Sequence, residues 1–122
     1  MKIAVSSTGT EPGSNVDLRF GRAPFFLIFD SESEDFEVIS NEENSQMAQG
    51  VGIQAAQLMA SKGVQILISG KVGPKAYSAL KMAGIEPVTF QGGTVSEAVE
   101  MARDGKLPKL SGPNAGGHGR PM

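Results

Sequence analysis

The sequence predicts an α/β protein with a mixed five-stranded sheet and three helices. Two observations predict this class. Three strand-like segments follow one another before residue 41, which indicates an antiparallel meander. From residue 51 to residue 107, helix-like and strand-like segments alternate, which implies parallel strands joined by right-handed crossovers. A chain of 122 residues is long enough for one domain with its own core.

The meander begins with a short apolar strand at residues 3–5 and a polar loop over residues 6–15. The second strand, residues 25–29, is uniformly apolar, so we expect both of its faces to be covered. Residues 36–40 alternate between apolar and polar, as in a half-exposed strand. In a meander, the second strand runs antiparallel to the first and the third.

The three predicted helices are bounded by known start and stop signals. Helix-like periodicity covers residues 51–62, 74–83 and 94–104. The second begins at a proline, which is favoured in the first helical position, and the third begins with a T-x-x-E capping box at Thr94 and Glu97. Each helix is followed by a glycine, the residue preferred just past a helix end; these are Gly63, Gly84 and Gly105.

The two remaining strands set the order of the sheet. Residues 64–69 form a buried strand, whereas residues 85–90 contain Pro87, which suits only an edge strand. The simplest sheet then has the order 3-2-1-4-5, with strand 2 antiparallel to the others. In this order, the first strand has strand 2 on one side and strand 4 on the other, and the chain departs in opposite directions on the two sides. This creates a switch point, the kind of place where α/β sheets bind ligands.

The loops at this switch point are the candidate binding site. They bring three helix N-termini together, and these favour anions. Arg19, Arg22, Lys71 and Lys75 add positive charge. We therefore expect an anionic ligand. The candidate residues are Ser6, Ser7, Arg19, Phe20, Gly21, Arg22, Asn41, Gly50, Gly70, Lys71, Gly73, Gly92, Gly93 and Thr94.

Some of these residues have a simpler structural interpretation. Arg22 could pair with an acidic loop, and Gly21 could serve the backbone through a positive φ or a close approach between chains. Phe20 is expected to be a hydrophobic plug at the rim. The stretch from Gly70 to Pro74 lacks the spacing of a nucleotide-binding phosphate loop.

Composition excludes several classes of function. Cysteine is absent, and His118 is the single histidine, so neither thiolate metal sites nor a Ser-His-Asp triad are expected. The net charge is −2, and no apolar run approaches 18 residues. These features argue against nucleic-acid and membrane partners and favour a cytoplasmic protein. No nucleophile with its base and no carboxylate pair emerges, so we expect a binding protein and not an enzyme.

Several segments together resemble the dinitrogenase iron–molybdenum cofactor biosynthesis family. They are FGRAPFFLIFD (20–30), the Asn41 loop, GVGIQAAQLMASKGV (50–64), LISGKVGPKAYSALKMAGI (67–85) and GGTVSEAV (92–99), in the family's order. The resemblance covers about residues 1–107. It implies a ribonuclease-H-like three-layer fold and a carrier of an iron–sulfur or iron–molybdenum type cluster or its precursor. It also implies cofactor-assembly proteins as partners.

The sequence departs from the family at positions where relatives carry possible metal ligands. Arg19 stands where many relatives have histidine, and Met47 and Gln49 stand where others have histidine or cysteine. The ligand-rich tail of some relatives is reduced to His118, the one candidate metal ligand. Binding of an anion by Arg22 and backbone amides, without direct metal ligation, agrees with these departures.

The sequence thus predicts one family-like domain over residues 1–107 and a flexible tail rich in glycine and proline over residues 108–122. The leading hypothesis is a non-enzymatic carrier of an anionic metal–sulfur cluster. The alternative is an interaction module of the same fold that contacts a partner protein and binds no metal. A nuclease is a remote third reading, because the first and fourth strands carry no clustered carboxylates.

Overall fold

The computed structural model describes residues 1–114. Its elements are β1 (Lys2–Ser7), β2 (Phe25–Asp30), β3 (Phe36–Ser40), α1 (Glu42–Ser45), α2 (Val51–Ser61), β4 (Val64–Ser69), α3 (Pro74–Met82), β5 (Glu86–Thr89) and α4 (Val95–Arg103). Among the helices of this part of the chain, none is both long enough and apolar enough to cross a membrane.

The five strands form one mixed sheet of order β3-β2-β1-β4-β5. Strand β2 pairs antiparallel with β1 and β3, whereas β4 pairs parallel with β1 and β5. The predicted order and the antiparallel second strand are therefore confirmed. Pro87 lies in β5, at the edge of the sheet, as its missing N–H requires.

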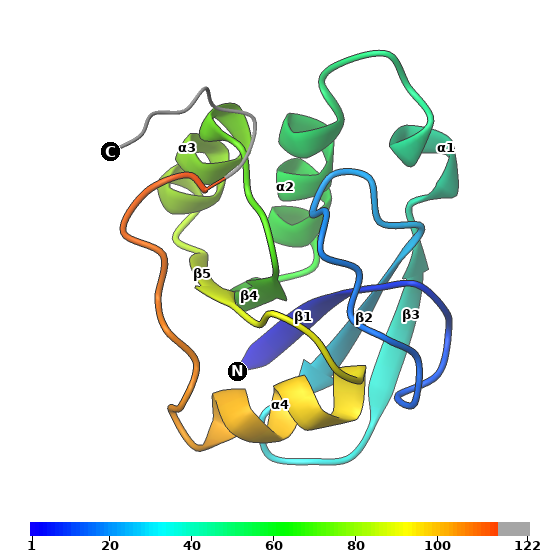
Figure 1. Ribbon diagram of the computed structural model, residues 1–122, viewed down its shortest axis with the longest axis vertical. Helices are drawn as coiled ribbons and strands as arrows, with labels where there is room; N and C mark the ends of the chain where they lie inside the picture. The colour runs from blue at the N-terminus through cyan, green and yellow to red at the C-terminus, as the bar shows by residue number, and fades with distance from the viewer. Residues whose placement is uncertain (115–122) are drawn as a thin grey trace.

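The sheet lies between two helical layers, which confirms the three-layer α/β fold (Figure 1). Helices α2 and α3 pack together on one face, over a core that includes Phe26, Met59 and Leu80. Helix α4 covers the other face, over a core that includes Leu27 and Val99. Neighbouring residues of β2 belong to opposite cores because side chains of a strand alternate between faces.

The predicted helix ends are confirmed, but the predicted number of helices is wrong. Gly63, Gly84 and Gly105 all have positive φ, between 69° and 79°, just past the ends of α2, α3 and α4. The described residues contain four helices, because α1 adds a single turn over Glu42–Ser45. Four residues without a buried side chain carry no periodic pattern, so sequence reasoning treated this turn as part of a loop.

Residues 108–114 run along β5 towards α3, and we call them the C-terminal strap (Figure 1). The Thr89 N–H donates to the Pro108 carbonyl and the Leu110 N–H donates to the Pro87 carbonyl. The described half of the expected flexible tail is thus hydrogen-bonded to the domain. The boundary at residue 107 stays a prediction, and His118 lies outside the described residues.

A candidate anion-binding pocket

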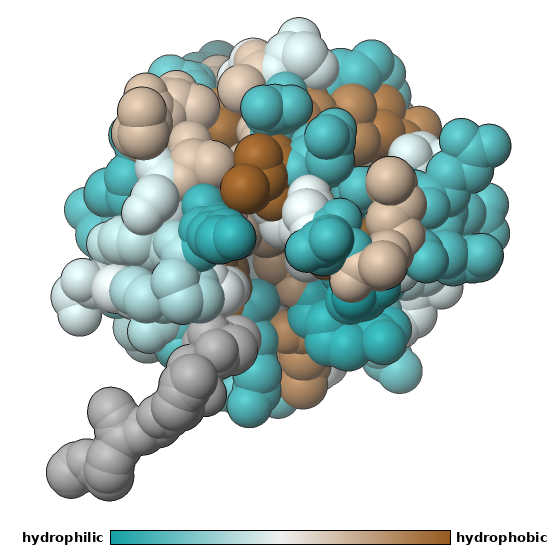
Figure 2. All heavy atoms as spheres, turned by 90° about the horizontal axis from the view of Figure 1, so that it is seen from above, coloured by the Kyte–Doolittle hydropathy of each residue, from teal (hydrophilic) through white to brown (hydrophobic). Residues whose placement is uncertain are grey.

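A cavity of about 740 Å³ opens at the carboxyl edge of the sheet, on the face that carries α2 and α3. Figure 2 shows this end of the molecule, with hydrophobic atoms at its centre and hydrophilic atoms around them. Three segments form the cavity: the loop before β2, the start of α2 and the start of α3. The lining residues are Arg19, Phe20, Gly21, Arg22, Gln49, Gly50, Val51, Gly52, Ile53, Lys71, Gly73, Pro74, Lys75 and Ala76.

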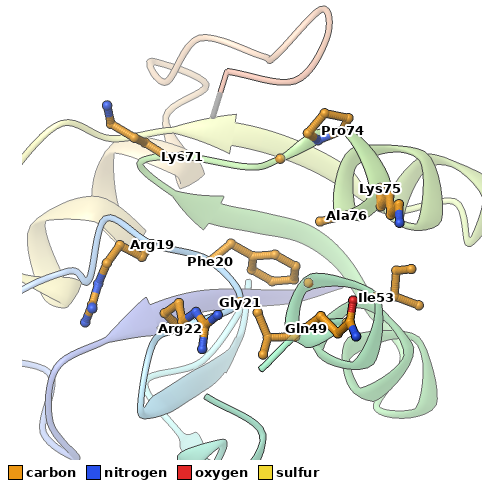
Figure 3. Close-up of a pocket in the computed structure, with 14 residues that line it drawn as sticks. Arg19, Phe20, Gly21, Arg22, Gln49, Ile53, Lys71, Pro74, Lys75 and Ala76 are labelled. Atoms are coloured by element: carbon orange, nitrogen blue, oxygen red, sulfur yellow. The ribbon is translucent and has the colours of Figure 1, made fainter. Parts of the chain in front are cut away.

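The centre of the pocket is apolar. The Phe20 ring is 2% exposed and packs against Phe26, with ring centroids 5.5 Å apart. Figure 3 shows this ring between the side chains of Lys71 and Gln49, with Ala76 and Ile53 on the helical side. Phe20 is therefore the hydrophobic plug that the sequence predicted, and it joins the pocket to the core under α2 and α3.

The rim of the pocket is cationic. Arg19, Arg22, Lys71 and Lys75 line it, and none of the lining residues is acidic. In Figure 3 the charged ends of Arg19 and Lys71 are turned away from the Phe20 ring, so the charges stand around the apolar centre. A protein of net charge −2 thus gathers positive charge at one cavity.

Arg19 is held by a buried carboxylate. Asp17 is 5% exposed, and its Oδ1 accepts from the Arg19 Nε (3.1 Å) and main-chain N–H (2.9 Å) while its Oδ2 accepts from Nη2 (2.9 Å). This hydrogen bonding, and then the negative charge of Asp17, raises the pKa of Arg19 above its usual value. Arg19 is therefore permanently charged, although Asp17 offsets part of its field.

Arg22 holds the loop that leads into α2. Its Nη1 donates to the carbonyl oxygens of Ser45 (2.9 Å) and Met47 (2.8 Å). Both partners are main-chain carbonyls, so no carboxylate offsets the positive charge of Arg22 in this contact. The sequence had left Arg22 between a structural and a binding role, and this contact gives it a structural one at the pocket rim.

Helices α2 and α3 both begin at the pocket without a side-chain cap. Their N-cap residues are Gly50 and Gly73, which have no side chain to accept a hydrogen bond. Within residues 1–114, the N–H groups of Val51, Gly52 and Ile53 find no acceptor. These three residues line the cavity together with the four cationic residues, and the positive ends of two helix dipoles lie at its edge.

Two glycines let the walls of the pocket approach closely. A Cβ on Gly21 would lie 2.9 Å from the Gly52 nitrogen, and a Cβ on Gly52 would lie 2.8 Å from the Ala76 Cβ. Gly21 does not have a positive φ, so of its two predicted backbone roles the close approach is the one observed. Together these contacts place the loop before β2, α2 and α3 side by side.

The loop after β4 is hydrogen-bonded on two sides. The Lys71 N–H donates to the Leu18 carbonyl (2.7 Å), and the Phe20 N–H donates to the Lys71 carbonyl (3.2 Å). On the other side, the Val72 N–H donates to Oδ1 of Asn114 (2.7 Å). Asn114 belongs to the C-terminal strap, and sequence reasoning gave it no role.

The structure brings some of the predicted site residues together and separates others. Those that line the pocket are Arg19, Phe20, Gly21, Arg22, Gly50, Lys71 and Gly73. Those that do not are Ser6, Ser7, Asn41, Gly70, Gly92, Gly93 and Thr94. For every residue in both groups, a role in binding stays a prediction.

The polar residues outside the pocket have structural partners. Ser6 is fully buried, and its hydroxyl lies 2.6 Å from the Asp17 carbonyl and 2.9 Å from the Ser69 Oγ. The Ser7 hydroxyl donates to the Gly9 carbonyl, and the Asn41 side chain donates to the carbonyls of Gly21 and Ala23. These residues support the loops near the pocket without reaching it.

Gly70 and residues 92–94 also lie away from the cavity. The space at Gly70 is filled by Leu18, whose Cδ2 would lie 2.7 Å from an added Cβ. Residues 92–94 lead into α4, which covers the opposite face of the sheet, and the Gly93 carbonyl accepts from the Val16 N–H. Only two of the three expected helix N-termini therefore meet at the pocket.

Sequence reasoning missed part of the lining: Gln49, Val51, Gly52, Ile53, Pro74 and Ala76 were not among the candidates, and Lys75 was noted only for its charge. The signal that could have found them is their place in the first turns of two helices that begin at the same edge. Among residues 1–114, no group of three or more His, Cys, Asp or Glu side chains could hold a metal ion.

Comparison with known proteins gives the family. The family model for the dinitrogenase iron-molybdenum cofactor matches residues 1–105. A protein of Methanocaldococcus jannaschii without a characterised function is 36% identical over 94 residues, which cover 75% of this chain and 79% of the relative.

Two solved structures are similar over nearly their whole length. The apo form of the orange protein from Desulfovibrio gigas has a TM-score of 0.90 and 40% identity, covering 93% of this chain and 96% of that one. A Thermotoga protein described as a candidate NifB protein has a TM-score of 0.83 and 39% identity, covering 95% and 98%. The chain therefore belongs to the dinitrogenase iron-molybdenum cofactor family.

Proposed function

We propose that this protein is a non-enzymatic carrier that holds an anionic metal–sulfur cluster, of iron–sulfur or iron–molybdenum type, or a precursor of one, in the pocket between α2 and α3. The observation that carries the proposal is the composition of the pocket. Four cationic residues and two uncapped helix N-termini surround an apolar centre, and no acidic residue lines it. The membership in the family named for this cofactor supports the same ligand class.

The lining residues suit a complete cluster better than a bare metal ion. They include neither His nor Cys, and neither Asp nor Glu, the side chains that usually ligate metals. A cluster whose metals are all coordinatively saturated by sulfide needs no protein ligand. Its negative charge would meet the cations and N–H groups of the rim. Its weakly hydrated sulfur surface would contact Val51 and Ile53, which are partly exposed at the pocket. Cofactor-assembly proteins would deliver the cluster to this carrier and receive it from the carrier.

Anaerobic titration of the full chain with tetrathiomolybdate, a small sulfide-ligated molybdenum anion, tests this proposal. We expect saturable binding, followed by visible absorption and by co-elution in gel filtration. Added salt should weaken it, because mobile ions screen the rim charges. Molybdate, a hydrated oxyanion of the same charge, should bind more weakly because it gains less from the apolar centre.

A matched pair of variants locates the site. Replacing Lys71 and Lys75 with Gln removes two charges from the rim, and we expect about tenfold weaker binding, equivalent to about 1.4 kcal/mol. Replacing Lys106 and Lys109 with Gln makes the same change in net charge at two exposed residues outside the pocket. This control should bind like the unmodified protein. Equal affinity for both pairs would place the ligand elsewhere.

The same titration decides the alternative function. A loop of exposed residues, 46–50, lies next to the pocket, and its Met47 side chain is 53% exposed. An exposed apolar side chain at a cavity also suits contact with a partner protein. If the protein binds neither tetrathiomolybdate nor the extracted iron–molybdenum cofactor, the carrier function is wrong and the interaction module becomes the leading proposal.

A further inference from the structure

One residue of the C-terminal strap, Asn114, is joined to the pocket loop by three hydrogen bonds. Its N–H donates to the Val72 carbonyl (2.9 Å), its Oδ1 accepts from the Val72 N–H (2.7 Å) and its Nδ2 donates to the Gly70 carbonyl (2.9 Å). The side-chain amide thus pairs with the loop as a further peptide group of a strand would.

The loop between β4 and α3 is hydrogen-bonded on two sides, and Asn114 supplies the partners on one of them. Lys71 uses its main-chain groups on Leu18 and Phe20, and Val72 uses both of its own on Asn114. Val72 is 1% exposed with the strap docked, so loss of the Asn114 side chain removes the protein partner of an N–H in a buried residue. With Asn114 in place, Lys71 and the start of α3 have fixed positions at the pocket.

The rest of the strap connects Asn114 to the body of the domain. Leu110 lies against the core under α2 and α3, and its carbonyl accepts from the Tyr77 hydroxyl (3.2 Å). Tyr77 belongs to α3, whose first turn lines the pocket. The strap therefore contacts α3 at Tyr77 and the loop that precedes α3 at Asn114.

We propose that Asn114 is a positioning residue of the pocket, and that docking of the strap and binding of the anion strengthen each other. The inference rests on the proposed function. If the Asn114 contacts are lost, the ligand must order the loop as it binds, and its affinity falls. Linkage requires the reverse effect of equal size, so a bound anion holds the strap more firmly in place.

The first test compares tetrathiomolybdate affinity among full-length variants. Asn114→Ala removes both side-chain bonds, and we expect binding about fivefold weaker, at the lower end of typical coupling. Ser111→Ala is the matched control, because Ser111 is an exposed residue of the same strap. Asn114→Gln keeps both amide groups one methylene further from the backbone and adds no charge. It is the second variant if the alanine variant does not fold, and it too should bind more weakly than the unmodified protein.

The second test measures the strap itself. Trypsin can cut after the exposed Lys109 only when the strap opens, so the cleavage rate follows the open population. We expect tetrathiomolybdate to slow this cleavage about fivefold in the unmodified protein and in Ser111→Ala. In Asn114→Ala, cleavage should be faster and should no longer respond to the ligand. A residue with a merely structural role would change the rate without changing that response.

The outcomes separate this inference from the proposed function. If the unmodified protein binds tetrathiomolybdate and Asn114→Ala binds it equally tightly, the positioning role is wrong and the carrier function stands. Cleavage at Lys109 that ignores the ligand in the unmodified protein would likewise overturn the coupling. If the unmodified protein does not bind at all, the carrier function fails and this inference fails with it.

Discussion

The N-terminus of α4 and those of α2 and α3 lie at the same edge of the sheet but are completed in opposite ways. Helix α4 has a full capping box, in which Thr94 accepts from the Glu97 N–H and Glu97 accepts from the Thr94 N–H. Helices α2 and α3 begin at Gly50 and Gly73 without any side-chain cap. The chain thus satisfies its own N–H groups where the edge is closed and leaves them free where the pocket opens.

The N-termini of α2 and α3 are held in place by close packing, whereas the N-terminus of α4 is held by hydrogen bonds. Gly21 approaches the Gly52 backbone, and Gly52 approaches the Ala76 Cβ, too closely to admit a methyl group. At the start of α4, the close neighbours of Gly93 are the side chains of Glu97 and Phe90. A pocket with free donors therefore obtains its rigidity from backbone approach.

Gly21→Ala should have the largest effect. The added methyl group would lie 2.8 Å from the Val51 Cγ2 and 2.9 Å from the Gly52 nitrogen, which belongs to the backbone and cannot move cheaply. We expect the free energy of unfolding to fall by about 1–3 kcal/mol, as in other overpacked sites. Urea unfolding measures this change. Gly112→Ala, at a glycine with open space around it, is the control, and an equal loss there would contradict the packing argument.

Gly73→Asp puts a cap where α3 has none. The backbone at Gly73 is extended, with φ −75° and ψ 174°, as an N-cap requires, so the fold should be retained. The carboxylate would take the helix N–H groups and bring negative charge to the pocket. We expect about tenfold weaker tetrathiomolybdate binding, or about 1.4 kcal/mol. Unchanged affinity would mean that the start of α3 does not contact the ligand.

Thr94→Ala makes the reverse change by uncapping α4. The Glu97 N–H loses its acceptor, and we expect the protein to lose about 1 kcal/mol of stability in urea unfolding. Because α4 covers the other face of the sheet, tetrathiomolybdate affinity should not change. Weaker binding in a fully folded Thr94→Ala protein would show that the site extends to this helix, as the sequence first indicated.

Glu97→Ala should have the smallest effect. It removes the second half of the capping box and a negative charge near the positive end of α4, and we expect a loss of about 0.5 kcal/mol. Repeating the unfolding measurement in high salt should reduce the difference, since the dipole contribution is screened. A loss larger than that of Thr94→Ala would reverse the assignment of the main contribution to the threonine.

The sheet was predictable because its signals are local and strong. The uniformly apolar β2, the alternation of helices and strands after residue 50 and the three terminal glycines set both the strand order and the helix ends. Helix α1 was missed because a four-residue turn has no period. The packing of the strap was missed because its composition indicates a loop and most of its contacts are made by the main chain.

The site was predictable only as an edge of the sheet. Topology places every loop after a parallel strand at the same edge, but it does not say on which face each loop lies. Phe20, Gly21 and Lys71 lie on the pocket face, whereas Gly92 and Thr94 lead to α4 on the other. That difference follows from long-range packing, which a loop's own residues do not encode.

The strap along β5 also bears on how this protein avoids misassembly. An uncovered edge strand is a template on which other chains can add strands. At β5 the Pro87 carbonyl and the Thr89 N–H are already bonded to the strap, so that template is closed. The opposite edge, β3, carries exposed Phe36 and Val38 with Glu37 between them. Growth of the sheet by strand addition is therefore confined to the β3 edge, where the Glu37–Lys62 ion pair (3.2 Å) places charged groups between the apolar side chains.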